Sequence, residues 1–187
     1  MLASARRAVV RFDLAVDSAF DHLRGNKAAD RVFYGASELG DFSLIWLLLA
    51  AARGLRSERD EKAAVRVAVG AAAESALVNG VIKSFFRRTR PPWDIVRPHR
   101  IRRPLTSSFP SGHATSAFSS AILLSEDDPL WPAYFAIAAV VASSRVYVKI
   151  HHASDVLAGV GVGVVLGVVG RKVMPLPPRG GGAGAPS

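Results

Sequence analysis

The chain has 187 residues, enough for one domain, and half of them are hydrophobic although only 8% are aromatic. It has no cysteine, which excludes disulfides and thiolate metal sites. Its formal net charge of +9 favours anionic partners such as phospholipid headgroups, phosphorylated substrates or nucleic acid.

The N-terminal residues 3–24 mix apolar and charged side chains in the manner of an amphipathic helix. A cleavable signal peptide is not expected, because Arg11, Asp13 and Asp17 interrupt the apolar stretch that such a signal needs. We expect this helix to lie on a membrane surface or to pack against the rest of the chain.

Apolar segments dominate the rest of the chain. They cover residues 42–52, 63–86, 111–124, 130–148 and 156–173. The second has the length of about 20 residues that crosses a bilayer, whereas the first reaches it only if it extends back through Tyr34. No stretch alternates with period two, so strands are not expected. The sequence predicts an all-α, integral-membrane helical bundle of about five transmembrane helices plus the N-terminal amphipathic helix.

The last apolar segment carries Gly159, Gly163 and Gly167 at four-residue spacing, a stripe that allows a second helix to approach closely in lipid. The Pro- and Gly-rich residues 175–187 that follow it are typical of a disordered tail. We therefore expect a single membrane domain over residues 1–174.

Polar residues gather where the predicted helices end. In an up-and-down bundle, the end of the second segment, the start of the third, the end of the fourth and the start of the fifth share one membrane face. The side chains expected to converge there are Lys83, Arg90, Ser111, His113, Arg145, His151 and Asp155.

The cationic residues of this group are suited to binding phosphate. Lys83 and Arg90 are seven residues apart and would share a helix face if the helix continued that far. Ser111, after a proline, indicates a helix N-cap, where free backbone N–H groups favour an anion. Arg145 adds a planar guanidinium that can bind two phosphate oxygens.

The histidines supply the reactive groups. His151 and Asp155 are four apart and would face each other on a helix, so Asp155 could accept the Nδ1 hydrogen and leave Nε2 as a nucleophile. His113 could protonate a leaving alkoxide. These parts suffice for phosphoryl transfer without a metal. A metal site made of both histidines, His152 and Asp155 is the alternative, which the dense positive charge nearby disfavours.

Three motifs carry a resemblance to a known family: K-x6-R-P from Lys83, P-S-G-H ending at His113, and S-R-x5-H-x3-D ending at Asp155. In this order they resemble the type 2 phosphatidic acid phosphatase superfamily, which includes bacterial acid phosphatases and vanadium haloperoxidases. The resemblance implies His151 as nucleophile, Asp155 as its orienting partner and His113 as general acid, with no metal or other cofactor. It implies that the phosphate is held by Lys83, Arg90, Ser111, Gly112 and Arg145.

The resemblance further implies a phosphoric ester hydrolase in the cell membrane, crossing it several times, with a phosphorylated lipid as substrate and no nucleic-acid partner. Candidate substrates are phosphatidic acid, phosphatidylglycerol phosphate, undecaprenyl diphosphate and polyprenyl-linked sugar phosphates. The Ala-, Val-, Arg- and Gly-rich composition is typical of a bacterium with a GC-rich genome. Short members of the family there resemble phosphatases of decaprenylphosphoryl-5-phosphoribose.

Two other functions compete with a lipid phosphatase. A haloperoxidase would use the same pocket for vanadate, but such enzymes are longer and soluble. A non-enzymatic basic membrane protein would recruit nucleic acid or anionic lipid. Counting cations near the membrane favours a cytoplasmic active site, whereas phosphate binding by the same cations is compatible with either side.

Several polar residues lie outside the motifs. Four arginines between the first two motifs bind either substrate phosphate or, as we favour, lipid headgroups: Arg97, Arg100, Arg102 and Arg103. Glu74 and Asn79 within the second segment should face the bundle interior, where a partner can satisfy them. His99 and His152 are expected at the surface.

Overall fold

The computed structural model describes residues 2–92, 97–102 and 106–178, and this part of the chain is helical and contains no strand. In chain order the α-helices are α1 (Leu2–Asp21), α2 (Lys27–Leu39), α3 (Leu44–Gly54), α4 (Glu58–Ser75), α5 (Gly112–Ser125), α6 (Trp131–Tyr147) and α7 (Ala153–Val173). A short 3₁₀ turn, η1 (Asp41–Ser43), joins α2 to α3, and α4 continues through a π-helical segment, η2 (Ala76–Val81), and a 3₁₀ turn, η3 (Ile82–Phe85). The predicted helical class is confirmed. Part of the predicted tail, residues 179–187, lies outside the described residues, as does Arg103.

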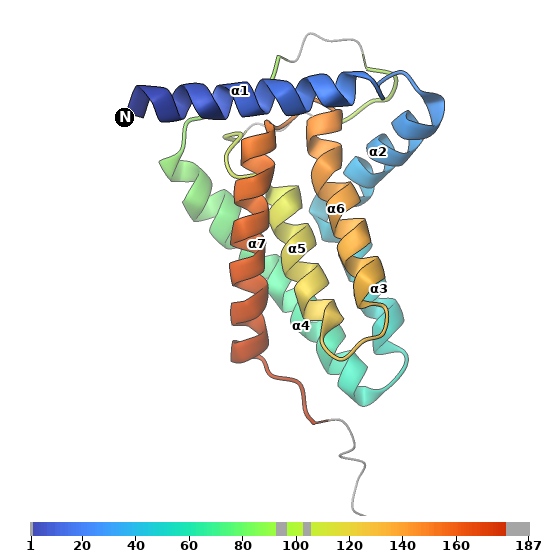
Figure 1. Ribbon diagram of the computed structural model, residues 1–187. Helices are drawn as coiled ribbons and strands as arrows, with labels where there is room; N and C mark the ends of the chain where they lie inside the picture. Colours follow the sequence, from blue (N-terminus) through green and yellow to red (C-terminus); the bar gives the residue numbers. More distant parts are fainter. Residues whose placement is uncertain (1, 93–96, 103–105, 179–187) are drawn as a thin grey trace, which may run out of the picture.

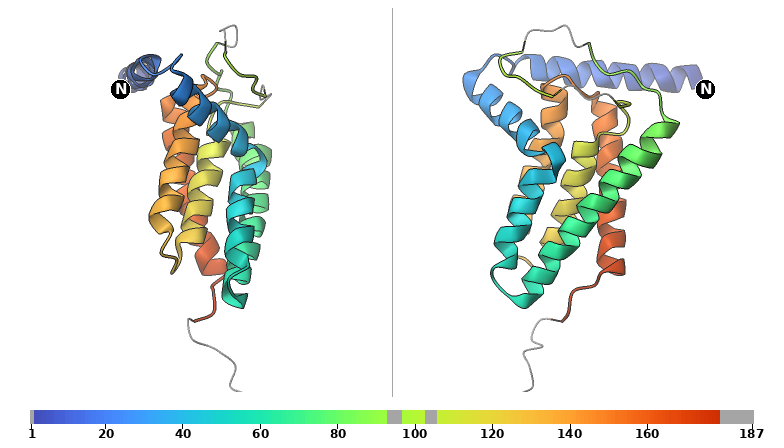
Figure 2. Two further views of the ribbon diagram at one scale, coloured as in Figure 1. Left: turned by 90° about the vertical axis from the view of Figure 1, so that its right-hand side faces the viewer. Right: turned by 180° about the vertical axis from the view of Figure 1, so that it is seen from behind.

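α5 lies at the centre of the bundle, with α3, α4, α6 and α7 around it, while α1 runs across one end (Figure 1). Seen from behind, α3 and α4 form a V that is closed at their connecting turn and opens toward the end that α1 crosses (Figure 2). Ala114, Ala117, Ala121 and Leu124 of α5 are fully buried. Small side chains on the central helix allow its neighbours to pack closely.

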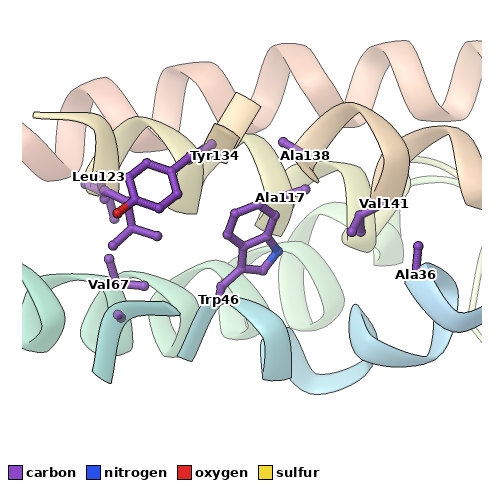
Figure 3. Packing of buried hydrophobic residues seen from close by; sticks show 11 residues of the cluster. Ala36, Trp46, Val67, Ala117, Leu123, Tyr134, Ala138 and Val141 are labelled. Atoms are coloured by element: carbon purple, nitrogen blue, oxygen red, sulfur yellow. The ribbon is translucent and has the colours of Figure 1, made fainter. Parts of the chain in front are cut away.

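An indole fills the middle of the bundle. Trp46 of α3 is fully buried and packs with Val67 of α4, Ala117 of α5 and Ala138 of α6 (Figure 3). The two alanines leave the room that the large ring requires, and the cluster joins four helices through one side chain.

The glycine stripe of α7 faces α5. A Cβ atom added to Gly159 would lie 2.5 Å from the carbonyl oxygen of Ser111, and one added to Gly167 would lie 2.8 Å from Cβ of Ile122. Gly163, between them, is equally close to the backbone of Thr115. The stripe therefore brings the two backbones together and fixes the start of α7 beside the start of α5.

In the part of the chain that the structure describes, two helices are long and apolar enough to cross a membrane: the continuous helix Glu58–Phe85, of 28 residues, and α7, of 21 residues. α2 and η1–α3 add a third span if this pair, bent by 72°, is counted as one. The bend lies where the first predicted segment would extend back through Tyr34, because Phe42 and Ser43 adopt left-handed backbone angles (φ 54° and 59°). α5 and α6 are shorter, with 14 and 17 residues.

The helix that carries Lys83 begins earlier than residue 63, where the predicted apolar segment began. The Ser57 side chain caps its N-terminus by accepting from the backbone N–H of Asp60. Glu58, Asp60 and Glu61 lie in its first turn, where carboxylates favour the positive end of the helix dipole. These charges make residues 58–62 helical although they are polar.

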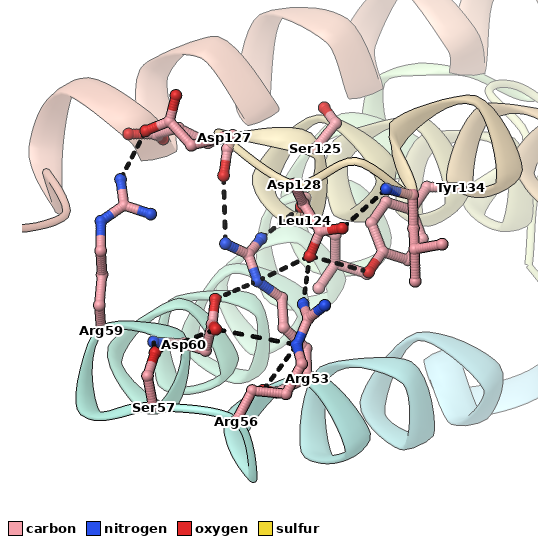
Figure 4. Close-up of polar contacts among 12 residues, drawn as sticks. Arg53, Arg56, Ser57, Arg59, Asp60, Leu124, Ser125, Asp127, Asp128 and Tyr134 are labelled. Atoms are coloured by element: carbon pink, nitrogen blue, oxygen red, sulfur yellow. Dashed lines mark hydrogen bonds and ion pairs between the residues drawn. The ribbon is translucent and has the colours of Figure 1, made fainter. Parts of the chain in front are cut away.

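A buried ionic network joins the α3–α4 turn to the α5–α6 turn, at the end opposite α1 (Figure 4). Arg53 Nε lies 2.7 Å from Asp60 Oδ1 and 3.3 Å from Asp128 Oδ2. Asp128 also accepts from the backbone N–H of Leu130 at 2.8 Å and from Arg56. These ion pairs hold the α3–α4 turn against the α5–α6 turn.

Replacing Asp128 with alanine should lower the thermal unfolding midpoint in detergent micelles by about 5–10 °C, because it removes an anion from the buried Arg53. The neighbouring Asp127→Asn is the control, since the Asp127 side chain is 52% exposed and that of Asp128 only 1%, and since asparagine tolerates the left-handed backbone at this position (φ 53°). Equal shifts of the two midpoints would contradict the structural role given to this network.

Candidate active site

A cavity of about 660 Å³ lies between α3 and α4, against α5. It is lined by residues from the turn before α7, from the start of α5 and from the end of the α4 helix. The predicted site residues in its lining are Lys83, Arg90, Gly112, His113, Arg145 and His151. Ser111 and Asp155, which are fully buried, lie behind this lining.

His151 lies in the turn between α6 and α7 rather than on a helix. The prediction that His151 and Asp155 face each other within one helix is therefore wrong. The chain has to reverse between two antiparallel helices, and it does so through Lys149, which has φ 53°. The His151 side chain is buried, and Arg90 Nη1 donates to its Nε2 over 3.0 Å. Burial lowers the pKa of His151 to about 3, so its imidazole is neutral at neutral pH.

Asp155 is held firmly beside this imidazole. Its Oδ2 accepts from Ser108 Oγ at 2.5 Å and from the backbone N–H of His152 at 2.9 Å, and its Oδ1 accepts from Arg88 Nη1 at 2.6 Å. Asp155 Oδ2 lies 3.7 Å from Nδ1 of His151, which is contact but longer than a hydrogen bond. Since Arg90 donates to Nε2, the hydrogen of the neutral ring belongs on Nδ1. This nitrogen lies on the side of the ring that faces the Asp155 carboxylate.

Arg90 reaches the site from an irregular segment. The helix that carries Lys83 ends at Phe85, so the prediction that Lys83 and Arg90 share a helix face is wrong. The guanidinium is instead fixed beside His151 by backbone carbonyls. Burial lowers the pKa of Arg90 to about 10, which leaves it protonated at neutral pH. The carbonyl oxygens that accept its hydrogens belong to Thr106 (3.2 Å), Ser107 (3.1 Å) and Ile150 (3.1 Å).

Arg145, from the last turn of α6, is buried beneath the cavity. Its Nη1 donates to Ser37 Oγ of α2, whereas its Nε has no hydrogen-bond partner among the described residues. A buried guanidinium with an unused N–H group is suited to an anion that enters the cavity.

His113 faces α2 and η1. Its Nε2 lies 3.1 Å from Asp41 Oδ1 and 3.1 Å from the carbonyl oxygen of Ser37. A Cβ atom at Gly40 would lie 2.7 Å from Cδ2 of His113, so the absence of a side chain there permits this approach. These two oxygen atoms can accept a hydrogen from Nε2, so they fix the orientation of the His113 ring in the cavity.

Lys83 and the start of α5 complete the lining. Lys83 Nζ donates to Asn79 Oδ1 at 2.9 Å and lies 3.3 Å from Thr106 Oγ1. A Cβ atom at Gly112 would lie 3.8 Å from this ammonium. Ser111 is the N-cap of α5, where its hydroxyl accepts weakly from the backbone N–H of Ala114 at 3.5 Å.

Arg88 and Asp13 were not among the predicted site residues. Arg88 donates to Asp155 Oδ1 and to Asp13 Oδ2, both at 2.6 Å. Asp13, on α1, also accepts from the backbone N–H and hydroxyl of Ser154 at 2.8 and 2.9 Å. The acidic residue that interrupts the apolar N-terminal stretch thus connects α1 to the start of α7. Ser37, Asp41 and Ser108 were missed as well, because no local pattern distinguishes them from ordinary helix-end or loop residues.

Replacing Arg88 with methionine should lower kcat by about 10- to 100-fold with little change in KM, because Arg88 acts on the reaction by positioning Asp155. Arg88→Lys should recover part of the loss, and the exposed Arg87→Met is the matched control. A loss of folded protein with unchanged kcat per folded molecule would show that Arg88 is only structural.

The remaining predicted residues lie around the rim. Arg97 donates to the carbonyls of Val148 and Lys149 at 3.3 and 3.4 Å and so supports the turn of His151. Arg102 lines the cavity and lies 5.0 Å from the ring centroid of Phe42, and Arg100 lines an adjoining pocket. His99 is exposed against Tyr34, and His152 is half-buried just before α7. Within the described residues, no three His, Asp or Glu side chains are grouped as metal ligands.

The cavity holds a neutral histidine whose Nε2 lies next to Arg90, and three further cations line it, namely Lys83, Arg102 and Arg145. Such an arrangement is suited to phosphoryl transfer. Comparison with known proteins agrees with this class. The profile of the PAP2 superfamily matches residues 63–177. The chain therefore belongs to the PAP2 superfamily.

Individual relatives are phosphatases. Decaprenylphosphoryl-5-phosphoribose phosphatase of Mycobacterium tuberculosis is 31% identical over 169 residues, which are 90% of this chain and 92% of that protein. Undecaprenyl-diphosphatase of Sulfolobus acidocaldarius is 34% identical over 88 residues, 45% of this chain and 43% of that protein. The crystal structure of a transmembrane PAP2 type phosphatidylglycerolphosphate phosphatase from Bacillus subtilis superposes with a TM-score of 0.64 at 24% identity, covering 89% of this chain and 86% of that one.

These matches confirm the family that the motifs indicated and the class of phosphoric ester hydrolase. Together with the membrane-length helices, they make the chain an integral membrane protein with lipid-phosphatase relatives.

Proposed function

We propose that the chain hydrolyses the terminal phosphomonoester of a polyprenyl-linked phosphoribose, with His151 as the nucleophile and without a metal. The observation that carries the proposal is the buried, neutral His151, whose Nε2 faces Arg90 in a cavity lined also by Lys83 and Arg145. The similarity that spans 92% of the mycobacterial phosphatase supports the choice of substrate.

In the first step, Arg90 exchanges its hydrogen bond to Nε2 of His151 for one to a phosphoryl oxygen. The freed lone pair of Nε2 attacks phosphorus, and the bond from phosphorus to the ester oxygen breaks. The leaving alkoxide takes a proton from His113, which becomes neutral, and the phosphoryl group stays on His151. Arg90, Arg145 and Lys83 compensate the charge on the phosphoryl oxygens. The Asp155 carboxylate stabilises the positive charge that the imidazole acquires.

In the second step, neutral His113 takes a proton from water, and the resulting hydroxide oxygen attacks phosphorus. The bond from phosphorus to Nε2 breaks, which releases inorganic phosphate and restores neutral His151. His113 is again protonated, so the cycle is complete without an added reactant.

The proposed membrane arrangement has five crossing segments, formed by α2–α3, α4–η3, α5, α6 and α7, with residues 1–174 as one domain in the cell membrane. α1 would lie along the surface at the active-site end. Its exposed Val9, Val10, Phe12 and Leu14 support contact with lipid, while Asp13 holds it to α7. A cavity between α3 and α4 allows a lipid-linked substrate to enter sideways from the bilayer.

Phosphate release by the purified protein tests the proposal. In detergent micelles with excess EDTA, decaprenylphosphoryl-5-phosphoribose should give a kcat/KM at least about tenfold above those of undecaprenyl diphosphate and phosphatidic acid. Equal values for the three lipids would overturn the substrate assignment. A preference for undecaprenyl diphosphate would favour a second candidate function, that of an undecaprenyl-diphosphatase, which rests on the similarity to the Sulfolobus enzyme.

A further inference from the structure

Glu74 of α4 is a buried carboxyl group that no step of the proposed reaction uses. The residue is 5% exposed and lines the cavity, and it has no hydrogen bond or ion pair among the described residues. A carboxyl group within a membrane bundle is costly unless a partner satisfies it. The expected position of Glu74 in the bundle interior agrees with the structure, whereas Lys83 acts on its carboxyl group through charge alone, without a hydrogen bond or close ion pair among the described residues. We therefore consider a ligand as its partner.

The helix changes its geometry directly after Glu74. α4 ends at Ser75, and η2 continues the chain as a π-helix over Ala76–Val81. π-helical segments are rare and often lie at functional sites, because the wider turn changes the direction of the side chains. Here Glu74, Ser75, Asn79 and Lys83 all line the same cavity.

Asn79 connects this group to the phosphate-binding cations. Its Oδ1 accepts from Lys83 Nζ at 2.9 Å, and its Nδ2 lies 3.3 Å from Ser75 Oγ, to which it can donate. The Ser75 hydroxyl then has its own hydrogen available for a ligand. Lys83, Asn79 and Ser75 thus follow one another at four-residue steps, and Glu74 adjoins Ser75 in the same cavity lining.

The chemistry of these groups defines the ligand. A carboxyl group accepts hydrogen bonds when it is ionised and both donates and accepts them when it is protonated, and a ligand hydroxyl can pair with either form. A second phosphate is disfavoured by like charge. The cavity continues along Leu47, Ala68 and Ala72, which suit a hydrocarbon chain. A ligand group with free hydroxyls, placed between a phosphate bound at the cations and this apolar wall, would lie beside Glu74.

We infer that Glu74, with Ser75 and Asn79, binds the hydroxyl groups of the sugar or polyol that is esterified to the reacting phosphate. Glu74 is then a specificity-determining residue that distinguishes hydroxylated lipid phosphates from those without hydroxyls near the phosphate. This inference rests on the proposed function, whose substrate carries free ribose hydroxyls.

The test is the ratio of two kcat/KM values, for decaprenylphosphoryl-5-phosphoribose and for phosphatidic acid, which has no free hydroxyl. Glu74→Ala should lower this ratio by about 10- to 100-fold, because the charged acceptor is lost only for the hydroxylated substrate. Glu74→Gln keeps one oxygen acceptor and should lower it by about 3- to 10-fold. Ser75→Ala should lower it by a smaller factor and serves as a second variant if Glu74→Ala does not fold.

The matched control is Glu61→Gln, an exposed residue at the far end of α4, for which the ratio should stay within about twofold of wild type. An unchanged ratio in all Glu74 variants, with both rates lowered equally, would overturn the inference and indicate a role through Lys83 or packing. If the wild-type protein released phosphate from neither of the two lipids, the proposed function would be overturned, and this inference would fall with it. The wild-type rate distinguishes the two failures.

Discussion

Replacing His151 with alanine is expected to lower kcat for lipid-phosphate hydrolysis by at least about 1,000-fold, because the reaction then loses its proposed nucleophile. We assign this role to His151 because its Nε2 lies 3.0 Å from Arg90 in the cavity and because burial keeps the ring neutral. The measurement is release of inorganic phosphate in detergent micelles, normalised to the amount of folded protein.

His99→Ala is the matched control for this variant, since His99 is exposed and outside the cavity lining. Its rate should stay within about twofold of wild type. Excess EDTA should leave the wild-type rate unchanged, because the proposed steps use only side chains and water. A His151→Ala protein with near-wild-type activity, or a wild-type rate that disappears with EDTA and returns with Mg²⁺, would contradict the mechanism.

Asp155→Asn should lower kcat by about 100- to 1,000-fold with a much smaller change in KM. The carboxylate accepts from Arg88, Ser108 and the backbone of His152, and it lies beside Nδ1 of His151. An amide in its place presents N–H to at least one of these donors, removes the negative charge that stabilises the imidazolium, and disturbs the ring tautomer.

Ser108→Ala separates the charge of Asp155 from its anchoring, because it removes a single hydrogen bond and keeps the carboxylate. We expect a loss of about tenfold or less for this variant. If Ser108→Ala and Asp155→Asn lowered kcat equally, anchoring of Asp155 rather than its charge would be the important property.

The gathering of several candidate site residues in one cavity could be predicted because their types and spacing are local. Lys83, His113 and Arg145 lie at helix ends in the sequence, and the structure brings them to one cavity. The two predictions that relied on helical spacing were wrong because the residues lie outside the helices. Arg90 follows the end of η3 at Phe85, and His151 precedes the start of α7. In both cases the segment outside the helix is shaped by hydrogen bonds to distant parts of the chain, as the carbonyl partners of Arg90 show.

The supporting residues could not be predicted for the same reason. Asp13 and Arg88 are separated by 75 positions and meet only because α1 crosses the end of the bundle, a packing that no local period encodes. Asp41 reaches His113 because Gly40 and the left-handed Phe42 and Ser43 bend the chain after α2. Boundaries within the bundle depend likewise on capping, as the early start of the α4 helix shows.

The central claim is that the phosphoryl group passes through His151, and rapid-quench labelling tests it most directly. Wild-type protein mixed with a ³²P-labelled lipid phosphate should form, before steady state, a phosphoenzyme that is stable in base and labile in acid, and whose label maps to His151 by peptide mass spectrometry. Phosphate release without such an intermediate, or an equally labelled His151→Ala protein, would contradict the mechanism.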